Sequence, residues 1–166
     1  HKIYGRRYNG NPNLKCFSAD DFDGLFTVPI SFMSGGTELH GYIYTYGARL
    51  SVARETADRA GAPKGLVIFS HGFGAGHTSY TTEVAALARA GFAVLAFDNT
   101  GCMSSGGNSL LGFDRGVLDL LAAVSFAEND ERLNGLKIAL VGHSWGAFSV
   151  MNAFPLAKNV RCAVAM

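Results

Sequence analysis

The sequence has few charges and no dense basic segment. Only 16% of its 166 residues are charged, the net charge is +1, and no run of Lys or Arg exceeds the pair Arg6 and Arg7. Nucleic-acid-binding domains carry clustered basic patches, so this composition argues against a nucleic-acid partner. It favours a protein that acts on a small molecule.

Cysteine is scarce, and long apolar runs are missing. The three cysteines, Cys16, Cys102 and Cys162, are far apart and show no CxxC spacing, which argues against a disulfide framework and a zinc site. No stretch reaches the roughly 18 apolar residues of a membrane span. The location in the cell stays open: no apolar leader is visible, which favours the cytoplasm, and a leader removed before His1 remains an alternative.

Apolar residues are nevertheless abundant, at 48% of the sequence. Four short continuous apolar runs occupy residues 66–70, 92–97, 137–142 and 160–166. Continuous runs of this length predict strands that are buried on both faces. Apolar stripes with helical spacing lie between them, at 84–88, 117–124 and 147–154. This alternation predicts an α/β fold with a mostly parallel sheet and helices on both faces.

The amino-terminal third has a different pattern. Residues 1–24 are polar and show no periodicity, which predicts an irregular lead-in. Apolar residues alternate over 26–32, and a Ser-Gly-Gly-Thr turn at 34–37 leads into a return segment, so an antiparallel β-hairpin is expected. Pro29 cannot donate a ladder hydrogen bond, which places the first arm at a sheet edge. Residues 48–64 are expected to form an exposed connection.

The segment LVGHSWGAF, residues 140–148, places Ser144 between Gly142 and Gly146. In a chain rich in glycine the bare GxSxG pattern carries little weight. Its position decides, because it lies directly between a predicted strand and a predicted helix, where a sharp turn exposes a nucleophilic hydroxyl above the sheet. The alternative is a turn serine that caps the following helix.

A second glycine-rich segment, HGFGAG at 71–76, follows the predicted strand 66–70. Ligands bind at the carboxyl ends of strands in open parallel sheets. Backbone amides of this segment are candidates for one half of an oxyanion hole. The amide of Trp145, in the first turn of the next helix, is a candidate for the other half.

The histidines near these motifs are interpreted as structural. His143 would project away from Ser144, so it is expected to be structural or to line a pocket, and His71 is expected to hold its loop by hydrogen bonds. His77 is expected at the surface, and a contact with the substrate is the alternative. Asp98, which follows the strand 92–97, is expected to stabilise a turn.

Three motifs occur in order on successive predicted strands: HGFG at 71–74, FDNTG at 97–101 and GHSWG at 142–146. Together they resemble the first part of the α/β-hydrolase fold, in its serine esterase and peptidase branch, over residues 25–166. Thr100 is a departure, because many members have Arg there, and this leaves the subfamily open.

The resemblance assigns roles to the residues of the two glycine-rich motifs. It implies that the amides of Phe73 and Trp145 form the oxyanion hole. The loop around Phe73 would act through its backbone, with Gly72 and Gly74 keeping the approach of the substrate carbonyl open.

By this resemblance the chain is part of a serine hydrolase that cleaves a small-molecule ester or a peptide through an acyl-enzyme on Ser144. No metal or organic cofactor is required. A non-catalytic ligand-binding member of the fold and an acyltransferase are the alternatives.

The position of Ser144 near the end of the sequence bears on the rest of the catalytic set. In the fold that the chain resembles, the nucleophile is followed along the chain by an Asp or Glu and then by a His. All five histidines precede Ser144, and no Asp or Glu follows it. The acid and base are therefore expected beyond Met166, in the remaining part of a single domain of which residues 25–166 form the amino-terminal part, ending after its sixth strand. The 166-residue chain alone is expected to be inactive.

Overall fold

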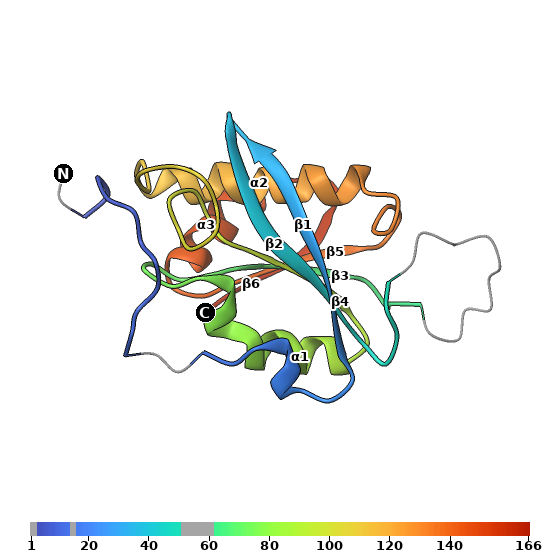
Figure 1. Cartoon of the computed structure of the whole chain (residues 1–166). Coiled ribbons are helices and arrows are strands. Elements are labelled where there is room, and N and C mark those ends of the chain that lie inside the picture. The colour runs from blue at the N-terminus through green and yellow to red at the C-terminus, as the bar shows by residue number, and fades with distance from the viewer. Residues whose placement is uncertain (1–2, 14–15, 51–61) are drawn as a thin grey trace.

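The computed structural model describes residues 3–13, 16–50 and 62–166. The described strands form one sheet in the order β1-β2-β4-β3-β5-β6. They are β1 (Leu25–Ser34), β2 (Thr37–Tyr46), β3 (Leu66–Ser70), β4 (Ala93–Phe97), β5 (Ile138–Gly142) and β6 (Val160–Ala165). β3, β4, β5 and β6 run parallel to one another, whereas β2 is antiparallel to both of its neighbours, β1 and β4. This arrangement confirms the predicted α/β fold with a leading hairpin (Figure 1).

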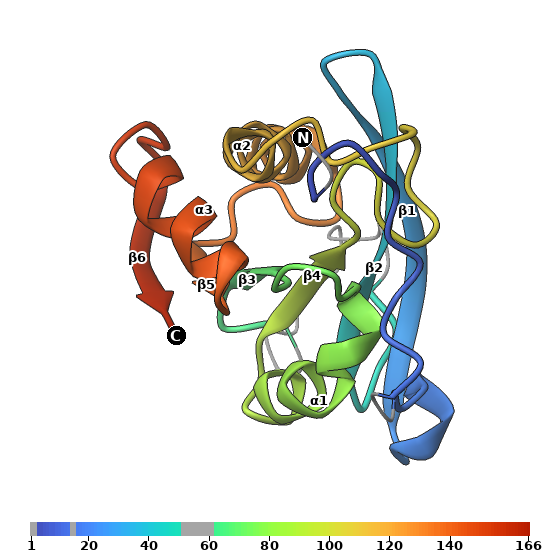
Figure 2. The ribbon, with the colours of Figure 1, turned by 90° about the vertical axis from the view of Figure 1, so that its left-hand side faces the viewer.

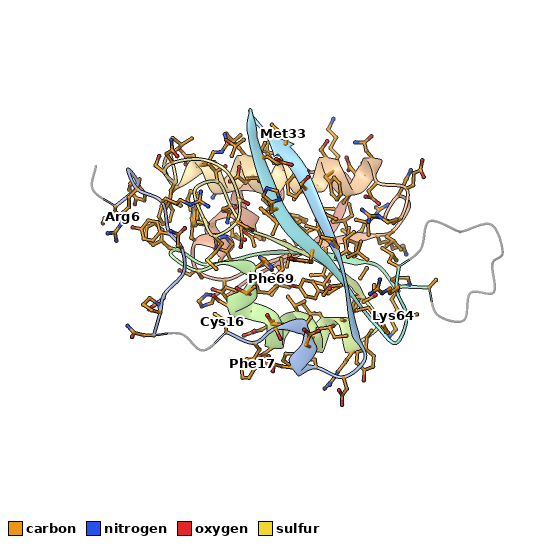
Figure 3. The ribbon with its side chains drawn as sticks, viewed as in Figure 1. Arg6, Cys16, Phe17, Met33, Lys64 and Phe69 are labelled. Atoms are coloured by element: carbon orange, nitrogen blue, oxygen red, sulfur yellow. The ribbon has the colours of Figure 1, made fainter. Side chains whose placement is uncertain are left out.

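Helices cover both faces of the sheet. The α-helices are α1 (Thr81–Arg89), α2 (Asp114–Asn129) and α3 (Trp145–Ala153), and the 3-10 helices are η1 (Ala19–Asp21) and η2 (His77–Tyr80). α1 lies on one face, and α2 and α3 lie on the other (Figure 1, Figure 2). Neighbouring side chains of β3 therefore enter different cores. Ile68 packs with residues of α2 and α3, whereas Phe69, labelled in Figure 3, packs with residues of α1.

The hairpin forms where the alternating pattern predicts it. β1 and β2 pair from Leu25 opposite Tyr46 to Ser34 opposite Thr37. β1 lies at the edge of the sheet, which confirms the position inferred from Pro29. Proline is tolerated in an edge strand because no second neighbour requires its missing amide hydrogen.

Burial confirms the predictions for β3 and β4 but not for β6. Every residue of β3 and β4 is buried, because each strand has two neighbours and helices on both faces. In β6 only Val160 is buried, and Arg161 and Cys162 are exposed. β6 is less buried than its continuous apolar run alone predicts, because it lies at the sheet edge with β5 as its sole described neighbour.

The apolar stripe predicted for the last helix is partly wrong. The predicted stripe ran through Ala147, Val150, Met151 and Phe154, but Met151 is 64% exposed and Phe154 is 40% exposed. The buried face of α3 consists of Trp145, Gly146, Ser149, Val150 and Ala153. α3 approaches the sheet closely at Gly146, so small residues such as Gly146, Ser149 and Ala153 face inward beside Trp145, and Met151 and Phe154 do not. The stripes predicted for α1 and α2 are confirmed, because their central residues are buried.

The lead-in passes along the end of the sheet at which the parallel strands finish (Figure 2). Tyr8 is attached there by two backbone hydrogen bonds: its amide donates to Gly101 (2.8 Å), and its carbonyl accepts from the amide of Met103 (2.8 Å). Residues at the start of the chain are thereby joined to the loop after β4. Most of the connection predicted to be exposed at 48–64 lies outside the described residues.

Candidate active site

The turn between β5 and α3 contains the predicted nucleophile. β5 ends at Gly142 and α3 begins at Trp145, so Ser144 stands in the turn between them. Ser144 has φ 55° and ψ −111°. Backbone conformations of this kind cost a residue with a Cβ about 1–3 kcal/mol and persist only where the surrounding structure imposes them.

Two glycines make this turn sterically possible. A Cβ at position 142 would lie 2.2 Å from the carbonyl oxygen of Gly146, and a Cβ at position 146 would lie 2.0 Å from the carbonyl oxygen of Ser70. Both distances are far shorter than van der Waals contact. The helix can therefore cross the sheet at this point only with glycine at both positions.

The backbone of Ser144 is held, while its side chain is exposed. Its amide donates to the carbonyl of Met166 (2.8 Å), and its carbonyl accepts from the amide of Phe148 (3.1 Å). Within the described ranges its hydroxyl makes no capping hydrogen bond to α3. The geometry therefore lacks the contact that a helix-capping serine would make.

The glycine-rich loop 71–76 leaves the end of β3, beside this turn. His71 is fully buried. The backbone amide of Asn99 donates to His71 Nε2 (3.0 Å), so Nδ1 carries the proton and donates to the carbonyl of Gly72 (2.8 Å). Burial lowers the pKa of His71, and the nearby carboxylate of Asp98 offsets part of that effect. His71 is thus a neutral ring that holds its own loop.

The two amides proposed by sequence for an oxyanion hole belong to residues that touch each other. The rings of Phe73 and Trp145 lie 6.0 Å apart. Trp145 is 1% exposed, and its indole Nε1 donates to the carbonyl of Phe113 (3.0 Å). Neither the amide of Phe73 nor that of Trp145 donates a backbone hydrogen bond to another described residue. Both donors remain available to a ligand.

Aromatic rings continue from this pair along the surface next to Ser144. Phe113 stacks on Phe73, with ring centroids 6.1 Å apart, and contacts Phe148 at 5.4 Å. Tyr4 of the lead-in packs edge-on against Phe113 at 5.6 Å. Because Phe148 lies one helical turn after Ser144, these rings form an uncharged wall beside the exposed serine.

Tyr80 is a site residue that the sequence did not indicate. Its hydroxyl accepts from the amide of Gly72 (3.1 Å) and shares a hydrogen bond with His143 Nδ1 (2.8 Å). Burial raises the pKa of Tyr80, and the hydrogen bond from Gly72 opposes that rise. Tyr80 thus joins the glycine-rich loop to the turn that holds Ser144. A tyrosine at the start of a helix gives no signal of such a bridge.

His77 and Asp98 form a buried pair. His77 is 5% exposed, so the prediction of a surface position is wrong. The cause is a contact between distant parts of the chain, because Asp98 Oδ1 lies 2.9 Å from both the backbone amide and the ring Nδ1 of His77. Burial acts to raise the pKa of Asp98, but the hydrogen bonds and charge of His77 outweigh it and lower the pKa to about 2.

Burial also determines the protonation of the Cys102 thiol. Cys102 is buried, which raises the pKa of its thiol to about 12 and keeps it protonated. Among the residues that the structure describes, no group of three or more His, Cys, Asp or Glu could hold a metal ion. In the same ranges no helix combines the length and apolar character needed to cross a membrane.

Solved structures resemble this chain over almost all of its length. An esterase from Pyrococcus furiosus superposes with a TM-score of 0.75 and 21% identity, over 96% of this chain and 56% of the esterase. An α/β-hydrolase from a Penicillium species gives 0.63 with 20% identity, over 83% of this chain and 44% of that protein. Epoxide hydrolase A from Mycobacterium thermoresistibile gives 0.58 with 25% identity, over 83% and 38%. The chain thus spans just over half the length of the esterase.

Sequence comparison gives the family. Among curated protein sequences none matches this chain significantly. The profile of the serine aminopeptidase family S33 matches residues 61–166, which include the glycine-rich loop and the Ser144 turn. Together with the sheet order and the α/β-hydrolase neighbours, this match shows that the chain belongs to the serine aminopeptidase S33 family of α/β-hydrolases.

Proposed function

We propose that this hydrolase acts by acyl transfer through Ser144. The observation that carries the proposal is the Ser144 turn, with a strained backbone, an exposed side chain and two obligatory glycines around it. Backbone strain of this kind is concentrated at functional sites, where it exposes a reacting group. A serine with a purely structural role would gain nothing from it.

In the proposed reaction Ser144 Oγ attacks the carbonyl carbon of an ester while a histidine takes the hydroxyl proton. The amides of Phe73 and Trp145 stabilise the negative charge on the carbonyl oxygen. The histidine then protonates the leaving alcohol, and water hydrolyses the acyl-serine by the same steps in reverse order. The aromatic wall formed by Phe73, Phe113 and Phe148 favours substrates whose groups next to the ester are uncharged.

The catalytic histidine and its acid are proposed to follow Met166 in the hydrolase domain. Three of the described histidines have other partners: His71 and His77 are buried against the loop after β4, and His143 is bonded to Tyr80. The order Ser, acid, His is typical of this fold. Residues 1–24 are accordingly proposed as a lead-in and residues 25–166 as the first part of one hydrolase domain.

The test is active-site labelling of the hydrolase that carries this chain. A fluorophosphonate probe should label Ser144, and Ser144→Ala should remove both the label and the hydrolysis of a short-chain aryl ester. Ser125→Ala, at an exposed serine on α2, is the matched control and should change neither. Labelling at another serine, or full activity in Ser144→Ala, would refute the proposal. A labelled serine without turnover in water would instead favour an acyltransferase.

A further inference from the structure

The glycine-rich loop is attached at both ends to two consecutive residues that follow β4. At its start the amide of Asn99 donates to the ring of His71 (3.0 Å). Just past its end Asp98 Oδ1 accepts from the amide and the ring Nδ1 of His77, both at 2.9 Å. All four side chains are buried, so these hydrogen bonds are shielded from competing water.

Asp98 is itself held in one orientation. Its Oδ2 accepts from the hydroxyl of Ser104 (2.9 Å), which leaves Oδ1 for His77. A Cβ at position 76 would lie 2.8 Å from Asp98 Oδ1, so the loop backbone runs directly against the carboxylate. Within the described ranges the other ring nitrogen of His77, Nε2, has no hydrogen-bond partner. Asp98 is therefore the polar group that fixes the His77 ring.

We propose that Asp98 is a positioning residue for the oxyanion hole and acts through His77. The inference rests on the proposed function, because it takes the amide of Phe73 as an oxyanion donor. Phe73 lies between the two anchored histidines, flanked by Gly72 and Gly74. Glycines restrict the backbone little, so the direction of the Phe73 amide depends on the two anchors, together with the hydrogen bond from Gly72 to Tyr80. A displacement of about 1 Å in a catalytic group can reduce the rate about 100-fold.

Loss of the contact between Asp98 and His77 should destabilise the transition state more than the bound substrate. An oxyanion donor contacts its target most strongly when negative charge develops on the carbonyl oxygen, so its displacement lowers kcat while KM changes little. A general loss of stability would instead act on the folded fraction and would vanish at temperatures well below the unfolding midpoint. A loss of kcat that persists well below the unfolding midpoint therefore indicates positioning and not simple stabilisation.

A second buried carboxylate provides the control. Asp119, on α2, binds the same loop after β4 but has other partners: it accepts from Thr100 and Ser34 and pairs with Arg115 (2.9 Å). Within the described ranges no hydrogen bond or ion pair joins Asp119 to His77 or to the glycine-rich loop. Asp119→Ala therefore removes a buried carboxylate that binds the same loop, and it should not release the Phe73 segment.

The experiment measures kcat and KM for a short-chain aryl ester, at a temperature well below each variant's unfolding midpoint, in the hydrolase that carries this chain. Asp98→Ala should lower kcat about 10- to 100-fold with KM changed less than about threefold. Asp98→Asn keeps an acceptor oxygen for His77 and should restore kcat to within about fivefold of the unsubstituted enzyme. Asp119→Ala should stay within about threefold. Unchanged kcat in Asp98→Ala, or an equal loss in Asp119→Ala, would overturn the inference.

A second pair keeps the test decisive if Asp98→Ala does not fold. His77→Asn places an amide nitrogen close to the position of Nδ1 and should retain most of kcat, whereas His77→Ala should lose it. Equal kcat in these two variants would overturn the inference. Failure of the proposed function has a different signature, because Ser144→Ala would then remain active, whereas failure of the positioning role leaves Ser144→Ala inactive and Asp98→Ala active.

Discussion

The loop after β4 and the turn after β5 follow the two strands that neighbour β3. Their polar groups lie in opposite environments. In the loop, Asp98, Asn99 and Thr100 are fully buried and hydrogen-bonded, apart from Asn99 Oδ1, which has no hydrogen-bond partner among the described residues. In the turn, Ser144 is exposed, has a positive φ and does not cap its helix within the described residues. Pairing of buried polar groups is a requirement of folding, whereas an exposed polar group in a strained turn adds no stability. The buried loop therefore supports the fold, whereas the strained turn at Ser144 costs stability, as expected for the proposed nucleophile.

Ser144→Gly should have the largest effect on the difference between turn and loop, because it removes the proposed nucleophile and the backbone strain of the turn together. Loss of a serine nucleophile lowers kcat by about 10⁵–10⁶. Glycine accepts a positive φ, so the free energy of unfolding should rise by about 1 kcal/mol after its larger entropy loss is counted. Ester hydrolysis and thermal unfolding measure the two effects. Ser144→Ala is the control, since it should lose activity without gaining stability.

Gly146→Ala should prevent folding of the turn, whereas the equivalent change in the loop should be tolerated. A Cβ at position 146 would lie 2.0 Å from a backbone oxygen of Ser70, but the closest atom to a Cβ at Gly106 is 3.1 Å away. A backbone clash of this size cannot relax without moving α3, so a loss of more than about 4 kcal/mol is expected. Soluble yield and thermal unfolding of the two variants test it. Similar stability in both would contradict the close crossing.

Gly74→Val tests whether strain in the glycine-rich loop lowers activity by displacing the proposed oxyanion hole. Gly74 has φ +72°, and Gly47, in the connection after β2, has φ +81°. Valine disfavours both conformations, but only the change at Gly74 should displace the Phe73 amide and lower kcat by about 10²–10³. Gly47→Val should lose comparable stability and keep its kcat. An unchanged kcat in Gly74→Val would remove the loop from the proposed oxyanion hole.

The smallest expected effect concerns the acid stability of the loop after β4. The pKa of Asp98 is lowered to about 2 in the folded state, against about 3.9 in an unfolded chain. The ionised carboxylate therefore stabilises the fold above about pH 4, and this contribution is lost as the pH falls toward 2. It amounts to about 2 kcal/mol. Denaturant unfolding should show the difference between the unsubstituted protein and Asp98→Asn shrinking over this range. A difference independent of pH would exclude an ionised Asp98.

Much of the fold follows from local patterns. The continuous apolar runs predicted β3, β4 and β5, and the alternating pattern with its Ser-Gly-Gly-Thr turn predicted the hairpin. These predictions succeeded because strand and helix periods are properties of neighbouring residues. The same reasoning failed for the inner face of α3, where the close approach of Gly146 to the sheet, and not hydrophobicity, decides which side chains point inward.

The candidate site was likewise predicted in some parts and missed in others. Spacing alone indicated the strand, turn and helix around Ser144 and the glycine-rich loop after β3, and both lie at the carboxyl ends of neighbouring strands. The roles assigned to Ser144, Phe73 and Trp145 stay predictions. The position of His77 was predicted wrongly and Tyr80 was missed, because each is defined by partners far away in the sequence.

The sequence by itself thus determined the α/β architecture, the edge position of β1 and the tight turn at Ser144, because each depends on the residue types within a few positions of one another. Only the tertiary structure decided that His77 is buried on Asp98 and that Tyr80 joins His143 to Gly72. The physical reason is strand order: β4 lies between β2 and β3, and β5 lies on the other side of β3. This order brings the ends of strands that are distant in sequence together, and no local period specifies it.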